Sequence, residues 1–391
     1  MSKFIKSTAL SLAISTLLIN ATAPLAYAAD NKAAQSINKI GFALLEKLSQ
    51  EENVVISPLS IYEALSITKD GASGETLEQM QKWFNLSATQ MKELNAALKP
   101  DPENSLALEI ANALYAEKNF PISKEFSQKV SPYGASVSNI EFGASGVGTI
   151  NKWVAQKTHD KIKDMLSTLT PEMKLVIINA VYFKARWQNE FTKGMTRDDE
   201  FQGANKKYKV KMMHRQAKYT YGEDSLCQMI SLPYHGSVAM QIYLPKEGKA
   251  KAEDLVKALA QNKINPALDY REVDYFMPRF KVEDKQDLEK ILPGMGMPLP
   301  FSKQADFFAM QAKPNRSVPF YISQVLHKTF MQVDEEGTEA AAATAVMMAA
   351  GCAMMKPQEP VLMKVNRPFV LRLQDGRSGT DLFIGVIRRP N

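Results

Sequence analysis

The side chains that most often carry out catalysis or bind metals are few in this chain. It holds four histidines and two cysteines in 391 residues. No histidine stands in an HExxH pattern or near a cysteine, so the spacing predicts no zinc site. No P-loop, GxGxxG or complete GxSxG motif is present, and Cys352, a potential thiol nucleophile, has no partner nearby in the sequence. We therefore predict no catalytic residue, metal ligand or cofactor. A hydrolase whose triad is assembled from distant residues is the alternative.

A cluster of basic residues between positions 206 and 218 is the second feature that could bind a ligand. Lys207, Lys209 and Lys211 alternate there with apolar residues. Because side chains alternate between the two faces of a strand, this spacing predicts that the lysines line the solvent face of an amphipathic strand. A site for polyanions is the alternative interpretation.

The segment between residues 334 and 360 is unusual because it is almost free of charge after its acidic start. Four alanines follow Glu339, and nearly every position up to residue 355 is small or apolar. No apolar face with helical period emerges, so a helix would have to be buried on all sides. As a strand, one face would carry only uncharged residues from Thr338 to Met348. Such a strand could enter the middle of a sheet without burying a charge.

The overall composition is that of an ordinary globular protein. Hydrophobic residues make up 45% of the chain and charged residues 23%, with 19 glycines and 20 prolines, which excludes collagen-like, coiled-coil and disordered classes. The 48 basic residues exceed the 42 acidic ones by too little to indicate nucleic acid as a partner. Two cysteines exclude a disulfide-stapled scaffold.

The first 28 residues have the pattern of a secretory signal peptide. Lys3 and Lys6 precede an apolar stretch at residues 9–19, and an Ala-Tyr-Ala sequence ends at Ala28. The apolar stretch is shorter than the roughly 20 residues that a membrane-spanning helix needs. We therefore expect cleavage after Ala28 and export of residues 29–391, either to the periplasm or to the extracellular space.

Apolar periodicity predicts the elements that would position these residues. Helices are expected over residues 34–50, 61–69, 76–83, 88–98, 148–165 and 284–292. Strands are expected over residues 175–187, 208–213, 227–233, 238–244, 273–280 and 361–373. Ser57 or Ser60 could cap the second helix. Helices prevail in the first half and strands in the second, without the alternation of a doubly wound sheet, so we predict one large α+β domain.

The charge-free segment and several further motifs resemble the serpin family. The hinge of inhibitory serpins is matched almost letter for letter by ten residues, namely Glu335, Glu336, Gly337, Thr338, Glu339, Ala340, Ala341, Ala342, Ala343 and Thr344. Further resemblances follow in order along the chain: NVVISPLSI (53–61), INKWV (150–154), NAVYFK (179–184), LPY (232–234), PRF (278–280), HK (327–328), RPF (367–369) and LFIG (382–385). Three departures are local: Asp160 where the family usually has glycine, Lys69-Asp70 within an apolar helical turn, and several extra residues between Gly337 and Phe369.

The resemblance implies a fold and an activity. The fold would be a single serpin domain of about nine helices around three β-sheets, with an exposed reactive centre loop at about residues 335–360. The protein would be a protease inhibitor and not an enzyme. A serine protease would attack the loop and form an acyl-enzyme, and the cleaved loop would insert into the main sheet and distort the protease. The resemblance implies a monomer that needs no cofactor and binds neither nucleic acid nor membrane.

The resemblance also assigns roles to residues far from the loop. Ser57, Ser60, Asn179 and His327 would lie where the main sheet opens, and Trp187 where the loop first inserts. Taken alone, His327 could equally be a buried histidine whose hydrogen bonds are satisfied. With the resemblance, His327 can be both a buried histidine and part of the opening region, because the hydrogen bonds that satisfy it would also govern the opening.

The cleaved bond is expected near the end of the charge-free segment. Counting fifteen residues inclusively from Gly337 places it after Gly351, and the longer loop extends the candidates to Cys352, Ala353, Met354 and Met355. These small and apolar residues favour an elastase-like or chymotrypsin-like serine protease, and Cys352 leaves a cysteine protease as an alternative. A serpin-fold carrier or chaperone without inhibitory activity is the second alternative. Pairing of Cys227 with Cys352 stays open.

Overall fold

The computed structural model describes residues 31–48, 52–99, 107–338 and 359–390. The predicted signal peptide, the hinge from Glu339 to Thr344 and all five candidates for the cleaved bond lie outside these ranges. No helix within them is both long and apolar enough to cross a membrane.

The described residues form seven α-helices and fifteen strands. The helices are α1 (Lys32–Leu45), α2 (Pro58–Lys69), α3 (Gly74–Gln81), α4 (Ala88–Ala97), α5 (Lys124–Val130), α6 (Ala144–Lys157) and α7 (Ala252–Ala260). The strands are β1 (Val54–Ile56), β2 (Ala107–Glu117), β3 (Ser136–Ile140), β4 (Leu175–Arg186), β5 (Arg197–Gln202), β6 (Lys207–Glu223), β7 (Cys227–Pro233), β8 (Val238–Pro245), β9 (Asp269–Pro278), β10 (Phe280–Asp287), β11 (Ile322–Val333), β12 (Gly337–Thr338), β13 (Val361–Lys364), β14 (Phe369–Asp375) and β15 (Asp381–Ile387). The predicted α+β class is confirmed.

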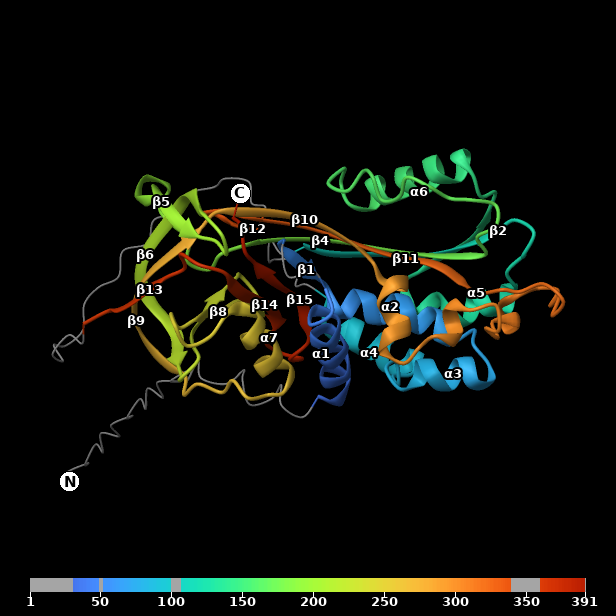
Figure 1. The fold of residues 1–391 in the computed structure, drawn as a ribbon, viewed down its shortest axis with the longest axis horizontal. Helices are drawn as coiled ribbons and strands as arrows, with labels where there is room; N and C mark the ends of the chain where they lie inside the picture. Colours follow the sequence, from blue (N-terminus) through green and yellow to red (C-terminus); the bar gives the residue numbers. More distant parts are fainter. Residues whose placement is uncertain (1–30, 49–51, 100–106, 339–358, 391) are drawn as a thin grey trace, which may run out of the picture.

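Two hydrogen-bonded sheets organise these elements. The first has the strand order β10-β11-β12-β4-β2-β3, and its long strands run side by side with α6 on one face and α2 on the other (Figure 1). The second has the order β1-β15-β14-β8-β7-β6-β9-β13, with β5 paired to β6. β6 joins two halves of this sheet, because it pairs with β7 only at residues 220–223 and with β9 over most of its length.

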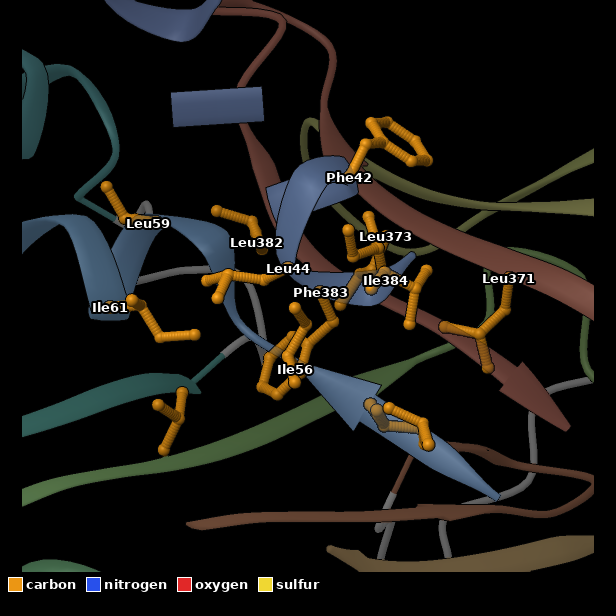
Figure 2. Packing of buried hydrophobic residues seen from close by; sticks show 14 of the residues in the cluster. Phe42, Leu44, Ile56, Leu59, Ile61, Leu371, Leu373, Leu382, Phe383 and Ile384 are labelled. Atoms are coloured by element: carbon orange, nitrogen blue, oxygen red, sulfur yellow. The ribbon is translucent and has the colours of Figure 1, made fainter. Parts of the chain in front are cut away.

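The core lies between the two sheets, around α2. Every residue of α2 is buried, which explains why this helix has no polar face in the sequence. Side chains from α1, β1, α2, β14 and β15 meet there, as Figure 2 shows for Leu44, Ile56, Ile61 and Phe383. The helix begins at Pro58, and the Ser57 hydroxyl accepts a hydrogen bond from the Ser60 amide at 3.4 Å, so the predicted Ser57 cap is confirmed.

The structure accounts for two of the three local departures from the family pattern, at Lys69-Asp70 and at Asp160. Lys69 is buried, but its ammonium group donates to the Leu86 carbonyl at 2.7 Å and lies 3.3 Å from the Asp70 carboxylate. The charge is therefore compensated inside the fold. Asp160 has a φ of +60°, a left-handed conformation that glycine adopts without steric cost. Aspartate tolerates this conformation better than most residues do, which is why it can replace the usual glycine.

Several element predictions were wrong. Residues 284–292 are not a helix, because β10 continues to Asp287 and only a short 3₁₀ turn follows at Leu288–Lys290. The predicted strand at 361–373 is divided into β13 and β14, and the helix predicted at 148–165 is α6, which ends at Lys157. The long strands β2 and β11 were not predicted, because buried polar residues such as Asn112 and His327 interrupt their apolar runs.

The basic cluster has the predicted arrangement. Lys207, Lys209 and Lys211 are exposed along β6, and the intervening Val210 is buried. Lys207 and Lys211 form ion pairs with Glu200 and Asp198 of the neighbouring strand β5. These two lysines therefore face partners within the protein, which favours the solvated strand face over a polyanion site.

Candidate functional site

Two parallel strands at the centre of the first sheet separate at one end to admit a third. β4 and β11 pair directly from Leu175 and Ile322 as far as Tyr182 and Phe330. Beyond that point β12 lies between them and runs antiparallel to both, with Thr338 opposite Val333 on β11 and Ala185 on β4. β12 is thus a short strand that already separates β4 from β11 at this end of the sheet (Figure 1).

Both residues of β12 fit this position closely. Gly337 has a φ of +155°, and a Cβ atom on it would lie 2.1 Å from the Ala185 carbonyl oxygen, so only glycine fits without displacement. The Thr338 side chain is fully buried, and its hydroxyl lies 2.7 Å from the Tyr234 hydroxyl. The narrow gap between β4 and β11 therefore requires the small residues Gly337 and Thr338.

Trp187 holds the segment that leads into β12. Its indole Nε1 donates to the Asp334 carbonyl at 2.9 Å, and its backbone amide donates to the Glu336 carbonyl at 3.0 Å. The indole ring stacks on Tyr234 with 4.1 Å between centroids. The sequence placed Trp187 where the loop inserts, and the structure places it against the residues that precede β12.

Two acidic residues anchor the same segment to side chains just before β5 and between β9 and β10. The Glu335 carboxylate is buried and accepts hydrogen bonds from Arg279 Nε at 2.7 Å and from the Thr196 hydroxyl. Burial disfavours the charged form, but these hydrogen bonds outweigh it and hold the pKa of Glu335 below its usual value. Glu336 pairs with Lys193. The hinge is therefore held by ion pairs at Glu335 and Glu336. The two residues that enter the sheet, Gly337 and Thr338, carry no charge.

Removing the Arg279 guanidinium is expected to loosen this anchor. In an Arg279→Ala variant the buried Glu335 carboxylate loses its charged partner, and we expect a loss of about 2 kcal/mol in unfolding free energy after allowance for the partial exposure of Arg279. Denaturant unfolding at pH 7.5 measures this loss. Arg279→Lys retains the charge and should recover part of it. Equal stability of Arg279→Ala and the unmodified protein would contradict the prediction.

A chain of buried hydrogen bonds crosses the strands just beyond the separation. The Ser57 amide donates to His327 Nε2 at 3.1 Å, so the proton of this imidazole lies on Nδ1, which donates to the Asn179 side-chain oxygen. Asn179 Nδ2 in turn donates to the Ser60 carbonyl at 3.1 Å. His327 and Asn179 are direct register partners on β11 and β4. The four residues predicted for the opening region are therefore in contact.

The chain of hydrogen bonds continues through two residues that the sequence did not indicate. Asn179 Nδ2 also donates to the Asn112 side-chain oxygen on β2, and Asn112 Nδ2 donates to the Glu63 carboxyl oxygen on α2 at 3.0 Å. Each donor points in the same direction, from Ser57 towards Glu63. A glutamate inside a mainly apolar helix and an asparagine inside an apolar run are the only local signals that could have revealed them.

Burial sets the charge state of His327 and Glu63, the two ionisable side chains in this series of hydrogen bonds. It lowers the pKa of His327 to about 3, so the imidazole is neutral at physiological pH, in agreement with its role as an acceptor from Ser57. Burial raises the pKa of Glu63 to about 7, although hydrogen bonds from Asn95 and Asn112 oppose the shift. The network is thus held together by neutral hydrogen bonds with one group that titrates near neutrality.

The described residues include few side chains of the kinds that bind metals or act as thiol nucleophiles in clusters. Among them no group of three or more histidine, cysteine or carboxylate side chains is arranged to hold a metal ion. Cys227 is a free, buried thiol, and burial raises its pKa to about 12, so it is a poor nucleophile. The geometry instead shows that β12 separates β4 from β11 at one end of the sheet, and that Asn179 and His327 connect these two strands by a hydrogen bond beyond that point.

Comparison with known proteins identifies the fold. The model of the serpin (serine protease inhibitor) family matches residues 35–390. This chain belongs to the serpin family. An uncharacterized serpin-like protein of Thermococcus kodakarensis is 34% identical over 368 residues, covering 91% of this chain and 85% of that protein. The human leukocyte elastase inhibitor is 34% identical, covering 89% of this chain and 96% of that serpin.

A solved serpin structure agrees with the architecture. The thermophilic serpin tengpin in its native state superposes with a TM-score of 0.82 at 31% identity, covering 92% of this chain and 95% of tengpin. Serpins as a family are serine protease inhibitors and generally not enzymes. In this serpin the partly opened sheet, the anchored hinge and the buried hydrogen-bond chain form the candidate functional site.

Proposed function

We propose that this serpin is an exported inhibitor that traps a serine protease as a covalent acyl-enzyme by inserting its cleaved loop between β4 and β11. The observation that carries the proposal is β12, an antiparallel strand of two residues that already lies between these strands. Extension of its register would bring residue 344 to the level of Asn179 and His327, which pair with each other across β4 and β11. The inserted strand would thus replace one parallel pairing by two antiparallel ones.

The free energy gained when two antiparallel pairings replace one parallel pairing would be sufficient to distort the protease. An inserted strand with about ten net additional hydrogen bonds gains on the order of 10 kcal/mol, at roughly 1 kcal/mol each. This is comparable to the whole stability of an ordinary domain and is enough to distort a protease active site. The residues that follow Thr338 carry a single charge, Glu339, before Lys356, so little desolvation opposes insertion.

The nature of the loop favours a particular class of protease. Residues 351–355 are glycine, cysteine, alanine and two methionines, which suit the apolar pockets of elastase-like or chymotrypsin-like enzymes. Similarity to the human leukocyte elastase inhibitor supports the same class. We propose export on the strength of residues 1–28. The proposed partner is therefore an extracellular or periplasmic serine protease of this specificity.

A denaturing gel tests the proposal directly. Mixing residues 29–391 with elastase is expected to produce a band that is heavier by the mass of the protease and survives boiling in detergent. Mass spectrometry of the released carboxy-terminal peptide would identify the cleaved bond among residues 351–355. Elastase whose catalytic serine has been sulfonylated serves as the control and should give no adduct, because no acyl-enzyme can form.

Further proteases separate the alternatives. An adduct with papain instead of elastase or chymotrypsin would establish a cysteine-protease inhibitor. Cleavage of the loop by elastase, chymotrypsin, trypsin and papain, with no adduct and no rise in thermal stability, would contradict inhibition and favour a carrier or chaperone.

A further inference from the structure

A small cavity lies at the end of the first sheet that is opposite β12. Its volume is about 320 Å³. One wall comes from residues 170–173, which lead into β4. The other wall comes from the start of β11 and from the 3₁₀ turns at Leu288–Lys290 and Leu299–Phe301. In Figure 1 the long strands β4 and β11 extend from this end of the sheet towards β12, so the cavity spans the two strands that the inserted loop would separate.

Aromatic and apolar side chains form part of the cavity lining. Phe301 and Tyr321 are partly buried and pack against the hydrophobic core. Met173 and Ile322 add apolar surface. The face of an aromatic ring attracts cations as well as apolar groups, because its π electrons give the face a partial negative charge. These residues therefore suit a ligand that combines an apolar body with a positive charge.

Two carboxylates share the same lining, those of Glu172 and Glu289. Glu289 accepts a hydrogen bond from the Val325 amide at 3.1 Å, and burial raises its pKa because the charged form is poorly solvated there. A hydrogen bond from the Thr170 hydroxyl holds the pKa of Glu172 below its usual value, so this side chain is ionised at neutral pH. The cavity therefore carries negative charge, part of it in a partly buried position.

The lysines whose charges act on these two carboxylates are engaged elsewhere. Lys290 forms an ion pair with Asp287 at 2.7 Å, and the Lys174 ammonium lies over the Phe120 ring, 5.1 Å from its centroid. Within the described ranges neither carboxylate of the cavity forms an ion pair. A cation that entered the cavity would therefore supply a partner that the protein itself does not.

We propose that this cavity binds a small organic cation, namely a protonated amine on an aromatic or other apolar body. The ammonium group would contact Glu172 and Glu289, and the body would lie against Phe301 and Tyr321. Both carboxylates would repel an anion. A ligand without charge would bury Glu289 further and give it no partner, which costs free energy.

Complete insertion of the loop would divide this cavity. Leu175 of β4 pairs with Ile322 of β11, and the Lys174 amide donates to the Ser323 hydroxyl at 2.8 Å, so the two walls are joined directly. Extension of the β12 register along β4 would bring residue 348 opposite Leu175. That residue precedes every candidate for the cleaved bond. An inserted strand would therefore reach the cavity and separate its walls.

A bound amine would accordingly hold β4 and β11 together. A ligand that binds one state and not another favours the state that it binds. At a concentration of about nine times its dissociation constant, the amine would leave about one site in ten free, so insertion would be slowed about tenfold. This regulatory effect rests on the proposed inhibitory function, whereas binding of the amine to the native serpin does not.

Calorimetric titration of the native serpin with phenethylamine tests the site without any protease. One saturable site is expected at pH 7.5. The neutral 2-phenylethanol and the anionic phenylacetate carry the same ring without the positive charge, and they should bind more weakly by about tenfold or more.

Two double variants locate the site. Glu172→Gln/Glu289→Gln removes both charges but keeps an oxygen that can accept from the Val325 amide, and it should weaken the binding of phenethylamine by about tenfold or more at a similar melting temperature. Glu93→Gln/Glu247→Gln is the matched control. It removes two exposed carboxylates from α4 and from the turn after β8, and it should bind phenethylamine as the unmodified serpin does.

The cleaved serpin tests whether the site depends on the pairing of β4 with β11. Serpin that has been cut in its loop by elastase, and whose melting temperature has risen through insertion, should bind phenethylamine more weakly by about tenfold or more. In the trapping reaction, phenethylamine at about nine times its dissociation constant should lower the ratio of adduct to released cleaved serpin about tenfold. The same amine should leave this ratio unchanged for Glu172→Gln/Glu289→Gln, which also controls for any effect of the amine on the protease.

Four outcomes would overturn the proposal. Absence of saturable binding to the native serpin, equal binding of 2-phenylethanol, or equal affinity of Glu172→Gln/Glu289→Gln and the unmodified serpin would each contradict the cation site. Equal affinity of the native and inserted forms would contradict its connection to the separation of β4 from β11. If neither an adduct nor an inserted form can be obtained, the titrations of the native serpin still decide the cation site, so its failure and the failure of the inhibitory function are distinguishable.

Discussion

A Thr338→Arg variant is expected to be cut by its target protease but to lose the ability to trap it. Thr338 is fully buried between β4 and β11, with its hydroxyl against Tyr234. In the proposed mechanism, insertion of the loop would proceed from this residue, which already lies in β12. A guanidinium there would have to be buried without a partner, which costs several kcal/mol.

The size of this effect follows from competition between two reactions of the acyl-enzyme. In the proposed mechanism, insertion would trap the protease, and hydrolysis would release it together with the cleaved serpin. Each 1.36 kcal/mol added to the insertion barrier slows insertion tenfold. An added barrier of about 3 kcal/mol would therefore shift the partition roughly a hundredfold towards hydrolysis, so the adduct should be almost absent from the gel and the cleaved serpin should accumulate.

Thr338→Ser is the matched control for this experiment. It keeps a small side chain and a hydroxyl that can reach Tyr234, so it should form adduct as the unmodified serpin does. Circular dichroism and the melting temperature before addition of protease would show that both variants are folded. Efficient trapping by Thr338→Arg would show that insertion does not begin at β12, and would contradict the proposed mechanism.

Glu63 is expected to lower the stability of the native state as the pH rises from about 5 to about 8. Its pKa is raised from 4.5 to about 7 by burial, so the folded state favours the protonated form. A group with this shift contributes stability that is complete below about pH 4.5 and is lost as the pH rises through about 7. A difference of this size corresponds to about 3 kcal/mol.

Replacing Glu63 with glutamine should remove this part of the pH dependence. The amide cannot ionise, but it can still accept a hydrogen bond from Asn112. The other groups that face Glu63 are the Asn95 amide and Tyr133, whose hydroxyl donates to Asp70 at 2.8 Å. Burial raises the pKa of Tyr133 far above neutrality, so this group does not titrate in the same range.

Denaturant unfolding at pH 5 and pH 8 measures the effect. Asp284→Asn is the necessary comparison, because burial also raises the pKa of Asp284, to about 6, and gives a slope of the same sign at lower pH. His327 contributes a slope of the opposite sign below about pH 6.5, because burial lowers its pKa from 6.5 to about 3 and only the unfolded state takes up the proton in that range. This contribution is expected to be the same in Glu63→Gln and in the unmodified serpin. Identical pH dependence in Glu63→Gln and the unmodified serpin would contradict the assignment.

Local patterns in the sequence carried most of the information about the hinge. The absence of charge after Glu339 and the run of alanines indicate a strand that can enter a sheet, because desolvation and steric size are properties of each residue and do not depend on the fold. The same holds for the Ser57 cap, which needs only a neighbouring amide. Gly337 and Thr338 of β12 are accordingly small, uncharged residues in a buried position between two strands.

Secondary structure was predicted well only where periodicity was uninterrupted. β7 begins and ends at the predicted residues, and α2 and β4 lie within a few residues of the predictions. The end of β10, from residue 284, was included in a predicted helix because Leu288, Ile291 and Leu292 follow it at helical spacing. Pairing with β11 decides in favour of the strand, and a local pattern contains no information about a partner some 40 residues away.

The sequence by itself determined which segment is suited to insertion, and through its motifs it indicated the serpin family. Only the tertiary structure decided where that segment meets the sheet and which hydrogen bonds cross the strands beyond it. These hydrogen bonds connect Glu63, Asn112, Asn179 and His327, whose bonded pairs are separated by 49 to 148 positions in the chain and lie on different elements. Hydrogen bonds are short-ranged and directional, so they connect such residues only after packing has brought β2, β4, β11 and α2 into register.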